Sequence, residues 1–160
     1  MSGTTLCIID MQTKFWGCKT AIISKVIHEI KKASRRKDPI IVVEYVSFGS
    51  TVKKIMEAIK KSGCDYTIVT KHNDDGGDEI AEACIKNGFF TPRYRLVGLY
   101  RSACVKETAK GMAWRGSHMP DNIKIQISLF ATTDEPFMRD KETEIELKYI
   151  SEVYHNIKVI

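Results

Sequence analysis

The chain has 160 residues, of which 43% are hydrophobic and 28% charged, and its formal net charge is +5 at neutral pH. This composition is typical of one globular domain, here residues 1–160, and excludes a disordered or fibrous protein. The amino terminus lacks a signal-peptide pattern and no apolar segment is long enough to cross a bilayer, so we expect a cytoplasmic protein with no membrane partner.

Short apolar runs separated by turn-forming residues predict six strands. Several are rich in β-branched residues, which fit a pleated sheet buried on both faces. In chain order the predicted strands are 5–9, 40–43, 66–69, 94–97, 122–130 and 157–160.

Segments between these strands carry the patterns of helices, with apolar residues recurring every three or four positions in the clearest of them. Polar residues and glycines mark their ends. The predicted helices are 21–37, a helix from a Ser50 cap to Gly63, a helix from an Asp78 cap to Asn87-Gly88, 105–114 and 141–154.

The alternation of strands and helices predicts an α/β fold with three layers, αβα. Its sheet is expected to be mainly parallel, doubly wound and Rossmann-like, with five to six strands in the order 3-2-1-4-5-6. In this order the first and fourth strands flank the point where the winding direction reverses. Ligands of such sheets bind at that point, beyond the carboxyl ends of the strands.

Three residues with chemically active side chains follow three different strands. Asp10 follows the first strand, Lys71 the third, and Cys104 comes after the fourth, near the start of a helix. The helix dipole and a nearby lysine would favour a thiolate at Cys104. Asp10 is suited to take the thiol proton and return it later, so the three residues are candidates for nucleophilic catalysis. Taken singly, each also fits a structural role: a buried cysteine, a turn aspartate and a solvated lysine.

The cysteines and histidines indicate neither disulfides nor a metal site. The five cysteines are scattered and odd in number, and the four histidines are far apart. This pattern is typical of a reducing compartment and lacks zinc-ligand spacing. The run Asp74-Asp75-Gly76-Gly77-Asp78 lacks the full spacing of a calcium loop and is interpreted as a turn. We expect no metal and no cofactor.

The excess positive charge is concentrated near the end of the first predicted helix, at Lys31, Lys32, Arg35, Arg36 and Lys37. Cations are favoured there by the helix dipole. No basic-aromatic interleaving accompanies them, so we do not expect nucleic-acid binding. The basic balance instead favours an anionic small-molecule substrate.

Two segments carry distinctive motifs. The first is an apolar strand followed by D-x-Q-x-x-F, matched by Asp10, Gln12 and Phe15. The second is a strand with Gly98, followed by C-V-x-x-T-A at residues 104–109. Both resemble signatures of the isochorismatase-like cysteine hydrolase family, within the nicotinamidase/isochorismatase superfamily. Lys71 stands between them where the family places its lysine, and the resemblance covers residues 5 to about 130.

The resemblance implies a nucleophile at Cys104, a general base and acid at Asp10 and electrostatic support from Lys71. Most such enzymes cleave a C–N bond of a small amide or ureido compound through an acyl-enzyme. The resemblance also implies a cis peptide bond between Leu99 and Tyr100, an oxyanion hole formed by the N–H groups of Tyr100 and Cys104, and assembly as a dimer or tetramer.

The sequence departs from the family pattern at several positions. Tyr100 replaces a small residue, and Arg101 and Ser102 replace Thr-Asp-like residues. Tyr100 and Arg101 are candidate pocket residues, together with Phe15 and Trp16. Core packing would also explain Phe15 and Trp16, which follow Asp10 closely. The region 44–48 lacks the D-x-H metal motif of nicotinamidases, which favours a metal-independent branch. A non-catalytic binding or scaffold module, or a redox-sensing thiol at Cys104, are the alternatives.

Overall fold

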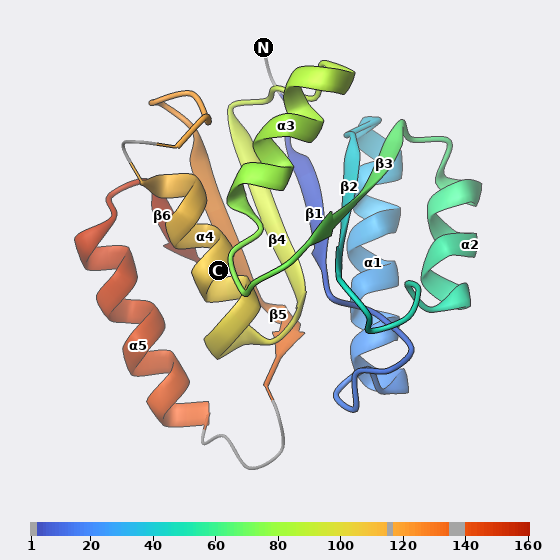
Figure 1. The fold of residues 1–160 in the computed structure, drawn as a ribbon, viewed down its shortest axis with the longest axis horizontal. Coiled ribbons are helices and arrows are strands. Elements are labelled where there is room, and N and C mark those ends of the chain that lie inside the picture. Colours follow the sequence, from blue (N-terminus) through green and yellow to red (C-terminus); the bar gives the residue numbers. More distant parts are fainter. Residues whose placement is uncertain (1–2, 115–116, 135–139) are drawn as a thin grey trace.

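The computed structural model describes residues 3–114, 117–134 and 140–160, which include a six-stranded sheet. Figure 1 shows this sheet with its helices. All paired strands are parallel, and their order is β3-β2-β1-β4-β5-β6. This confirms the doubly wound α/β fold and the strand order predicted from the sequence. The strands are β1 (Thr5–Ile9), β2 (Ile40–Tyr45), β3 (Tyr66–Lys71), β4 (Arg93–Leu99), β5 (Lys124–Thr133) and β6 (Ile157–Val159).

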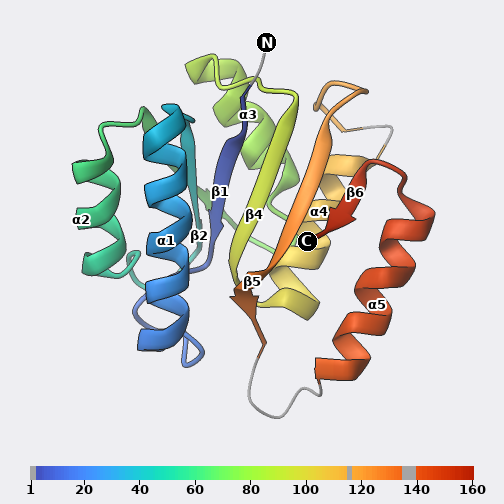
Figure 2. The ribbon, with the colours of Figure 1, turned by 180° about the vertical axis from the view of Figure 1, so that it is seen from behind.

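Helices cover both faces of the sheet and bury two separate apolar clusters. One face carries α1 (Thr20–Arg36) and α2 (Lys53–Ser62), which come to the front in Figure 2. The other face carries α3, α4 and α5, and a π-helical turn, η1, precedes α4. Their bounds are α3 (Gly77–Asn87), η1 (Arg101–Val105), α4 (Lys106–Ala113) and α5 (Asp140–Val153).

Two helix starts differ from the sequence prediction. The residue that precedes α2 is Val52 rather than Ser50, and Asp78 lies inside the first turn of α3 instead of capping it. At α3 the Asp75 carboxylate accepts a hydrogen bond from the Gly77 N–H (2.7 Å). The sequence pattern identified a polar residue near each helix start, Ser50 and Asp78. The backbone turn before each helix, however, decides which side chain reaches the free N–H groups of its first turn.

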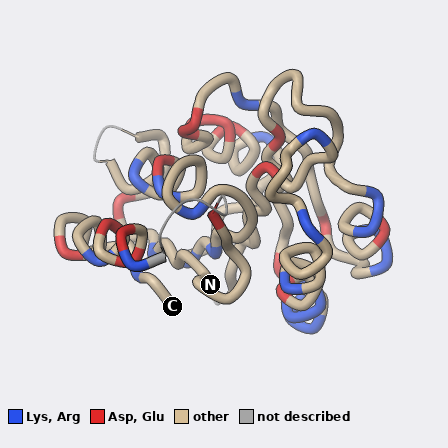
Figure 3. Tube along the Cα trace, turned by 90° about the horizontal axis from the view of Figure 1, so that it is seen from below, with Lys and Arg blue, Asp and Glu red and all other residues tan. Residues whose placement is uncertain are grey.

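Basic residues gather on α1 and α2, as Figure 3 shows. The turn that holds Cys104, η1, leads into α4, which lies on the opposite face of the sheet. In the described part of the chain, no helix combines the length and apolar character needed to span a membrane. The basic residues of the two helices are Lys25, Lys31, Lys32, Arg35, Arg36, Lys53, Lys54, Lys60 and Lys61.

Gly98 permits the close approach of β4 to β1 beside the candidate site. It pairs with Ile9, has φ of +115°, and a Cβ there would overlap the Ile9 carbonyl oxygen. We expect Gly98→Ala to lower the free energy of unfolding by about 2 kcal/mol or more, because both the backbone angle and the overlap are unfavourable. Gly88→Ala is the control: it shares a positive φ, but a Cβ there meets open space. Equal losses in urea denaturation would contradict this explanation.

Candidate active site

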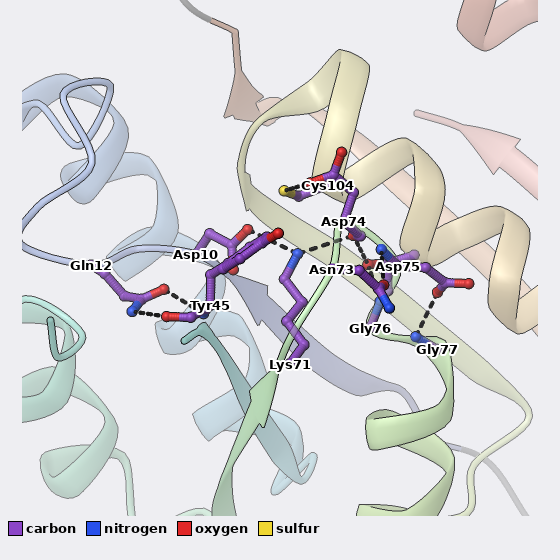
Figure 4. Close-up of polar contacts among 11 residues, drawn as sticks. Asp10, Gln12, Tyr45, Lys71, Asn73, Asp74, Asp75, Gly76, Gly77 and Cys104 are labelled. Atoms are coloured by element: carbon purple, nitrogen blue, oxygen red, sulfur yellow. Dashed lines mark hydrogen bonds and ion pairs between the residues drawn. The ribbon is translucent and has the colours of Figure 1, made fainter. Parts of the chain in front are cut away.

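The carboxyl ends of β1, β3 and β4 bring the three candidate residues together (Figure 4). Asp10 directly follows β1, Lys71 is the last residue of β3, and Cys104 lies in η1. The Lys71 Nζ is 3.0 Å from Asp10 Oδ2, and both side chains are fully buried. The Cys104 thiol is close enough to Asp10 for each group to shift the pKa of the other. Three residues far apart in sequence therefore form one polar cluster.

The segment after β1 is fixed by Gln12. The Gln12 side chain accepts a hydrogen bond from the Tyr45 N–H (2.6 Å) and donates to the carbonyl oxygens of Tyr45 (2.9 Å) and Gly49 (2.6 Å). These bonds join the ends of β1 and β2. The centroid of the Tyr45 ring lies 4.8 Å from Lys71 Nζ, a favourable cation–π distance.

A second carboxylate, that of Asp74, also reaches the thiol. Its Oδ1 lies 3.5 Å from Cys104 Sγ, within hydrogen-bond range for sulfur. The sequence interpretation placed Asp74 in a turn and missed this contact. The available signal was its position three residues after Lys71, in the loop that leaves the same strand end.

Burial dominates the electrostatics of the cluster. It raises the pKa of Asp10 above its ordinary value, and the Lys71 charge opposes this only in part. Burial, together with the negative charge of Asp10, raises the pKa of the Cys104 thiol to about 12 despite the opposing Lys71 charge. The resting sulfur is therefore a thiol, whereas helix dipole and lysine alone predicted a thiolate. A carboxylate with a raised pKa is a better proton acceptor for such a thiol.

The pH dependence of Cys104 alkylation tests this account. Iodoacetamide labelling of Cys104 should rise with pH without a plateau up to pH 10, because the pKa lies near 12. Asp10→Asn removes a negative charge that raises this pKa, but it also removes the proposed proton acceptor. The ratio of the variant rate to the wild-type rate should therefore increase from pH 7 to pH 10, because free thiolate carries more of the reaction at high pH. Peptide mass mapping separates Cys104 from the partly buried Cys18, which serves as the internal reference. A ratio that stays constant or falls over this range would contradict the assigned electrostatics.

An aromatic cluster lies beside the catalytic candidates. The Phe15 ring stacks on Phe48 (centroids 4.3 Å apart) and packs edge-on against Tyr100 (5.7 Å). The Tyr100 hydroxyl accepts a hydrogen bond from the Gly17 N–H (3.1 Å). Trp16 lies outside this cluster: the residue is 60% exposed, and the Lys19 Nζ lies 4.3 Å from its ring centroid. Of the aromatic pocket candidates, the structure thus groups Phe15 with Tyr100 and not with Trp16.

Arg101 and Ser102, which also depart from the family signature, anchor η1. Arg101 bonds to β5, and Ser102 bonds to Asp134, the residue that follows β5. The Arg101 guanidinium donates to the carbonyl oxygens of Leu129 (2.9 Å) and Thr132 (2.6 Å) and to the Thr132 hydroxyl. Ser102 donates its N–H and its hydroxyl to the Asp134 carboxylate, each at 2.7 Å. Arg101 is therefore engaged with β5. The peptide bond between Leu99 and Tyr100 is cis, as the resemblance implied.

The region where nicotinamidases carry a metal motif has a different role here. The Glu44 carboxylate accepts hydrogen bonds from the N–H and hydroxyl of Thr51, each at 2.7 Å. Within residues 3–114, 117–134 and 140–160, no cluster of three or more His, Cys, Asp or Glu side chains has the arrangement needed to hold a metal ion.

Comparisons with known proteins give matches to solved structures alone: no family model and no curated protein matches the sequence. A ribonuclease from Caenorhabditis elegans is 20% identical, with a TM-score of 0.75 over 99% of this chain and 77% of its own. A nicotinamidase from Staphylococcus aureus is 15% identical, with a TM-score of 0.77 over 99% and 98%. An N-carbamoylsarcosine amidase from Thermoplasma acidophilum is 21% identical, with a TM-score of 0.67 over 98% and 95%.

Other matching structures are an isochorismatase-like hydrolase from Alkaliphilus metalliredigens and an isochorismatase from Pseudomonas putida. At such identities the likeness establishes the fold, and the activities belong to those proteins. The chain has the isochorismatase-like fold, which agrees with the resemblance found in its sequence.

Proposed function

We propose that this chain, which has the isochorismatase-like fold, is a metal-independent cysteine hydrolase that cleaves a C–N bond of a small amide or ureido compound. The observation that carries the proposal is the meeting of Asp10, Lys71 and Cys104 at the carboxyl edge of the sheet, with a buried Asp10–Lys71 ion pair. The activities named for two structural neighbours, a nicotinamidase and an N-carbamoylsarcosine amidase, support the same chemical class.

In the proposed first step, the Cys104 sulfur attacks the substrate carbonyl carbon while its proton passes to Asp10. A thiol with a pKa near 12 needs such a proton acceptor, because almost no thiolate exists at neutral pH. The Asp10 carboxyl then protonates the departing nitrogen, which leaves an acyl group on Cys104 as a thioester. Lys71 supports the cycle by stabilising the ionised form of Asp10.

In the second step, water attacks the thioester carbonyl carbon and gives its proton to Asp10. The C–S bond breaks, the carboxylic acid leaves, and the proton returns to the sulfur. The backbone N–H groups of Tyr100 and Cys104 are the proposed donors to the oxyanion formed in both steps. Phe15 and Tyr100 would form an apolar wall beside the scissile group.

Ammonia release from a panel of small primary amides and ureides tests this function. Wild type should release ammonia from at least one compound, and Cys104→Ala should not. An RNA oligonucleotide belongs in the panel because one structural neighbour is a ribonuclease. The basic residues of α1 and α2 lie away from η1, so we expect no cleavage of it.

A non-catalytic binding module is the second candidate. It is favoured by the burial of Cys104, whose side chain is 4% exposed, and by the packing of the Tyr100 ring next to the site. In that case no amide in the panel would be hydrolysed and no acyl group would appear on Cys104. The high thiol pKa opposes the third reading, a redox-sensing thiol, because such thiols need thiolate character.

A further inference from the structure

The loop between β3 and α3 places a carboxylate at the nucleophile that the proposed triad does not use. Asp74 Oδ1 contacts Cys104 Sγ at 3.5 Å, and the Asp74 side chain is exposed, whereas Asp10 is fully buried. Figure 4 shows Asp74 and Asp10 approaching the cluster from different elements. A substrate that reaches the sulfur from solvent would therefore pass the Asp74 carboxylate.

The position of Asp74 is fixed by the residues of the site itself. Its carbonyl oxygen accepts hydrogen bonds from Lys71 Nζ (3.0 Å) and from the Thr108 hydroxyl (3.3 Å). The same hydroxyl accepts from the Gly76 N–H (3.0 Å), which ties the loop to α4. Lys71 thus holds Asp10 through a carboxylate oxygen and Asp74 through a backbone oxygen. The Asp74 side chain is aimed by this backbone anchoring.

The nearby cations are paired with groups other than the Asp74 carboxylate. Lys71 forms the buried ion pair with Asp10. Arg101 donates to β5, and Lys106 pairs with Glu146 at 2.8 Å and with Glu107 at 3.8 Å. The positive charge that dominates the whole chain lies on α1 and α2 (Figure 3). The exposed charged group in contact with the Cys104 sulfur is therefore a carboxylate, although the protein as a whole is basic.

We propose that Asp74 determines specificity by selecting a substrate that carries a cationic or N–H-rich group next to the scissile carbonyl, and by disfavouring an anionic one. This inference rests on the proposed hydrolase function. The expected charge of the substrate is therefore opposite to the one predicted from the net charge of the chain, because nearby charges act more strongly than distant, screened ones. The carboxylate would accept hydrogen bonds from an ammonium, amidinium or terminal ureido group.

Charged thiol reagents test the local field without requiring turnover. Two methanethiosulfonates, one with an aminoethyl and one with a sulfonatoethyl group, transfer their alkylthio group to a thiolate and release methanesulfinate. The modification rate at Cys104 is followed by peptide mass mapping, and the ratio of the cationic to the anionic rate cancels changes in thiol pKa. The variants are Asp74→Asn and, as a control for net charge, Asp78→Asn, which changes an exposed carboxylate four residues away.

Wild type should favour the cationic reagent, and Asp74→Asn should lower the ratio on the order of tenfold, as expected for one charge a few ångströms from the path. Asp78→Asn should leave the ratio close to that of wild type. An unchanged ratio in Asp74→Asn would overturn the proposal, even if the two modification rates both rose or both fell by the same factor. So would an equal fall in Asp78→Asn.

The outcome is separable from the hydrolase function. If the panel yields no turnover while the ratio responds to Asp74, the effect of the Asp74 charge on the approach to Cys104 stands and the hydrolase proposal fails. If turnover is found, Asp74→Asn should raise KM for cationic amides more than for neutral ones, with a smaller change in kcat. Loss of kcat alone, equal for both substrate types, would overturn the specificity role.

Discussion

Cys104→Ala should lower kcat for ammonia release at least about 10³-fold, because the acyl group has no other atom on which to form. The substitution removes one buried sulfur, which costs about 1 kcal/mol of stability and leaves the fold intact. The loss is therefore expected in kcat and not in the amount of folded protein. Steady-state ammonia release, measured with circular dichroism on the same samples, checks both parts.

Cys84→Ala is the matched control for this substitution. Cys84 is also a free, buried cysteine, but it lies in α3, where its sulfur contacts the Tyr94 hydroxyl at 3.5 Å. Its loss should lower stability by a similar amount and leave kcat within about twofold, because it is not near the reacting atoms. Cys104→Ala with more than a tenth of the wild-type activity would contradict a nucleophilic role.

Lys71→Met should lower the free energy of unfolding by about 3–5 kcal/mol at pH 8, because it leaves the Asp10 carboxylate buried without its cation. Methionine retains most of the volume of the lysine stem, so a packing loss contributes little. Urea denaturation of wild type and variant measures the difference. Activity should fall in parallel, since Asp10 loses the charge that favours its ionised form, and its pKa rises further.

The pH dependence gives this prediction its sign. In the variant, burial raises the pKa of Asp10 further above its value in the unfolded chain, so the folded state binds the proton more tightly. Stability is then lost as pH rises from the unfolded pKa through the folded one, and the deficit should be smaller at pH 5 than at pH 8. The double variant Asp10→Asn, Lys71→Met should recover part of the loss. A deficit that is independent of pH, or is not reduced in the double variant, would assign it to packing.

Much of the fold was predictable because each element carries its own pattern. The apolar runs that became β1, β2 and β4 are fully buried along most of their length, and buried parallel strands differ clearly from amphipathic helices. Their alternation with helices limits the topology to a few right-handed crossovers. The helix caps were less predictable: Ser50 and Asp78 fit the local pattern, but tertiary contacts set the path of the chain before each helix.

The site shows the same division. Asp10, Lys71 and Cys104 were predictable because parallel strands deliver the residues at their ends to one edge of the sheet. Asp74 was missed because its partner, Cys104, is 30 residues away and turn aspartates are common. Arg101 was predicted to line the pocket because it is close to Cys104 in sequence. Its hydrogen bonds to β5 join residues about 30 positions apart, and neighbours in sequence do not reveal them.

The formation of an acyl-enzyme tests the central claim most directly. The best amide of the panel is mixed with wild type, the reaction is quenched in acid within milliseconds to seconds, and the intact mass is recorded before peptide mapping. We expect a transient mass increase equal to the acyl part of the substrate, located on the peptide that contains Cys104 and missing in Cys104→Ala. Turnover that proceeds without any acylation of Cys104, or unimpaired in Cys104→Ala, would contradict the account.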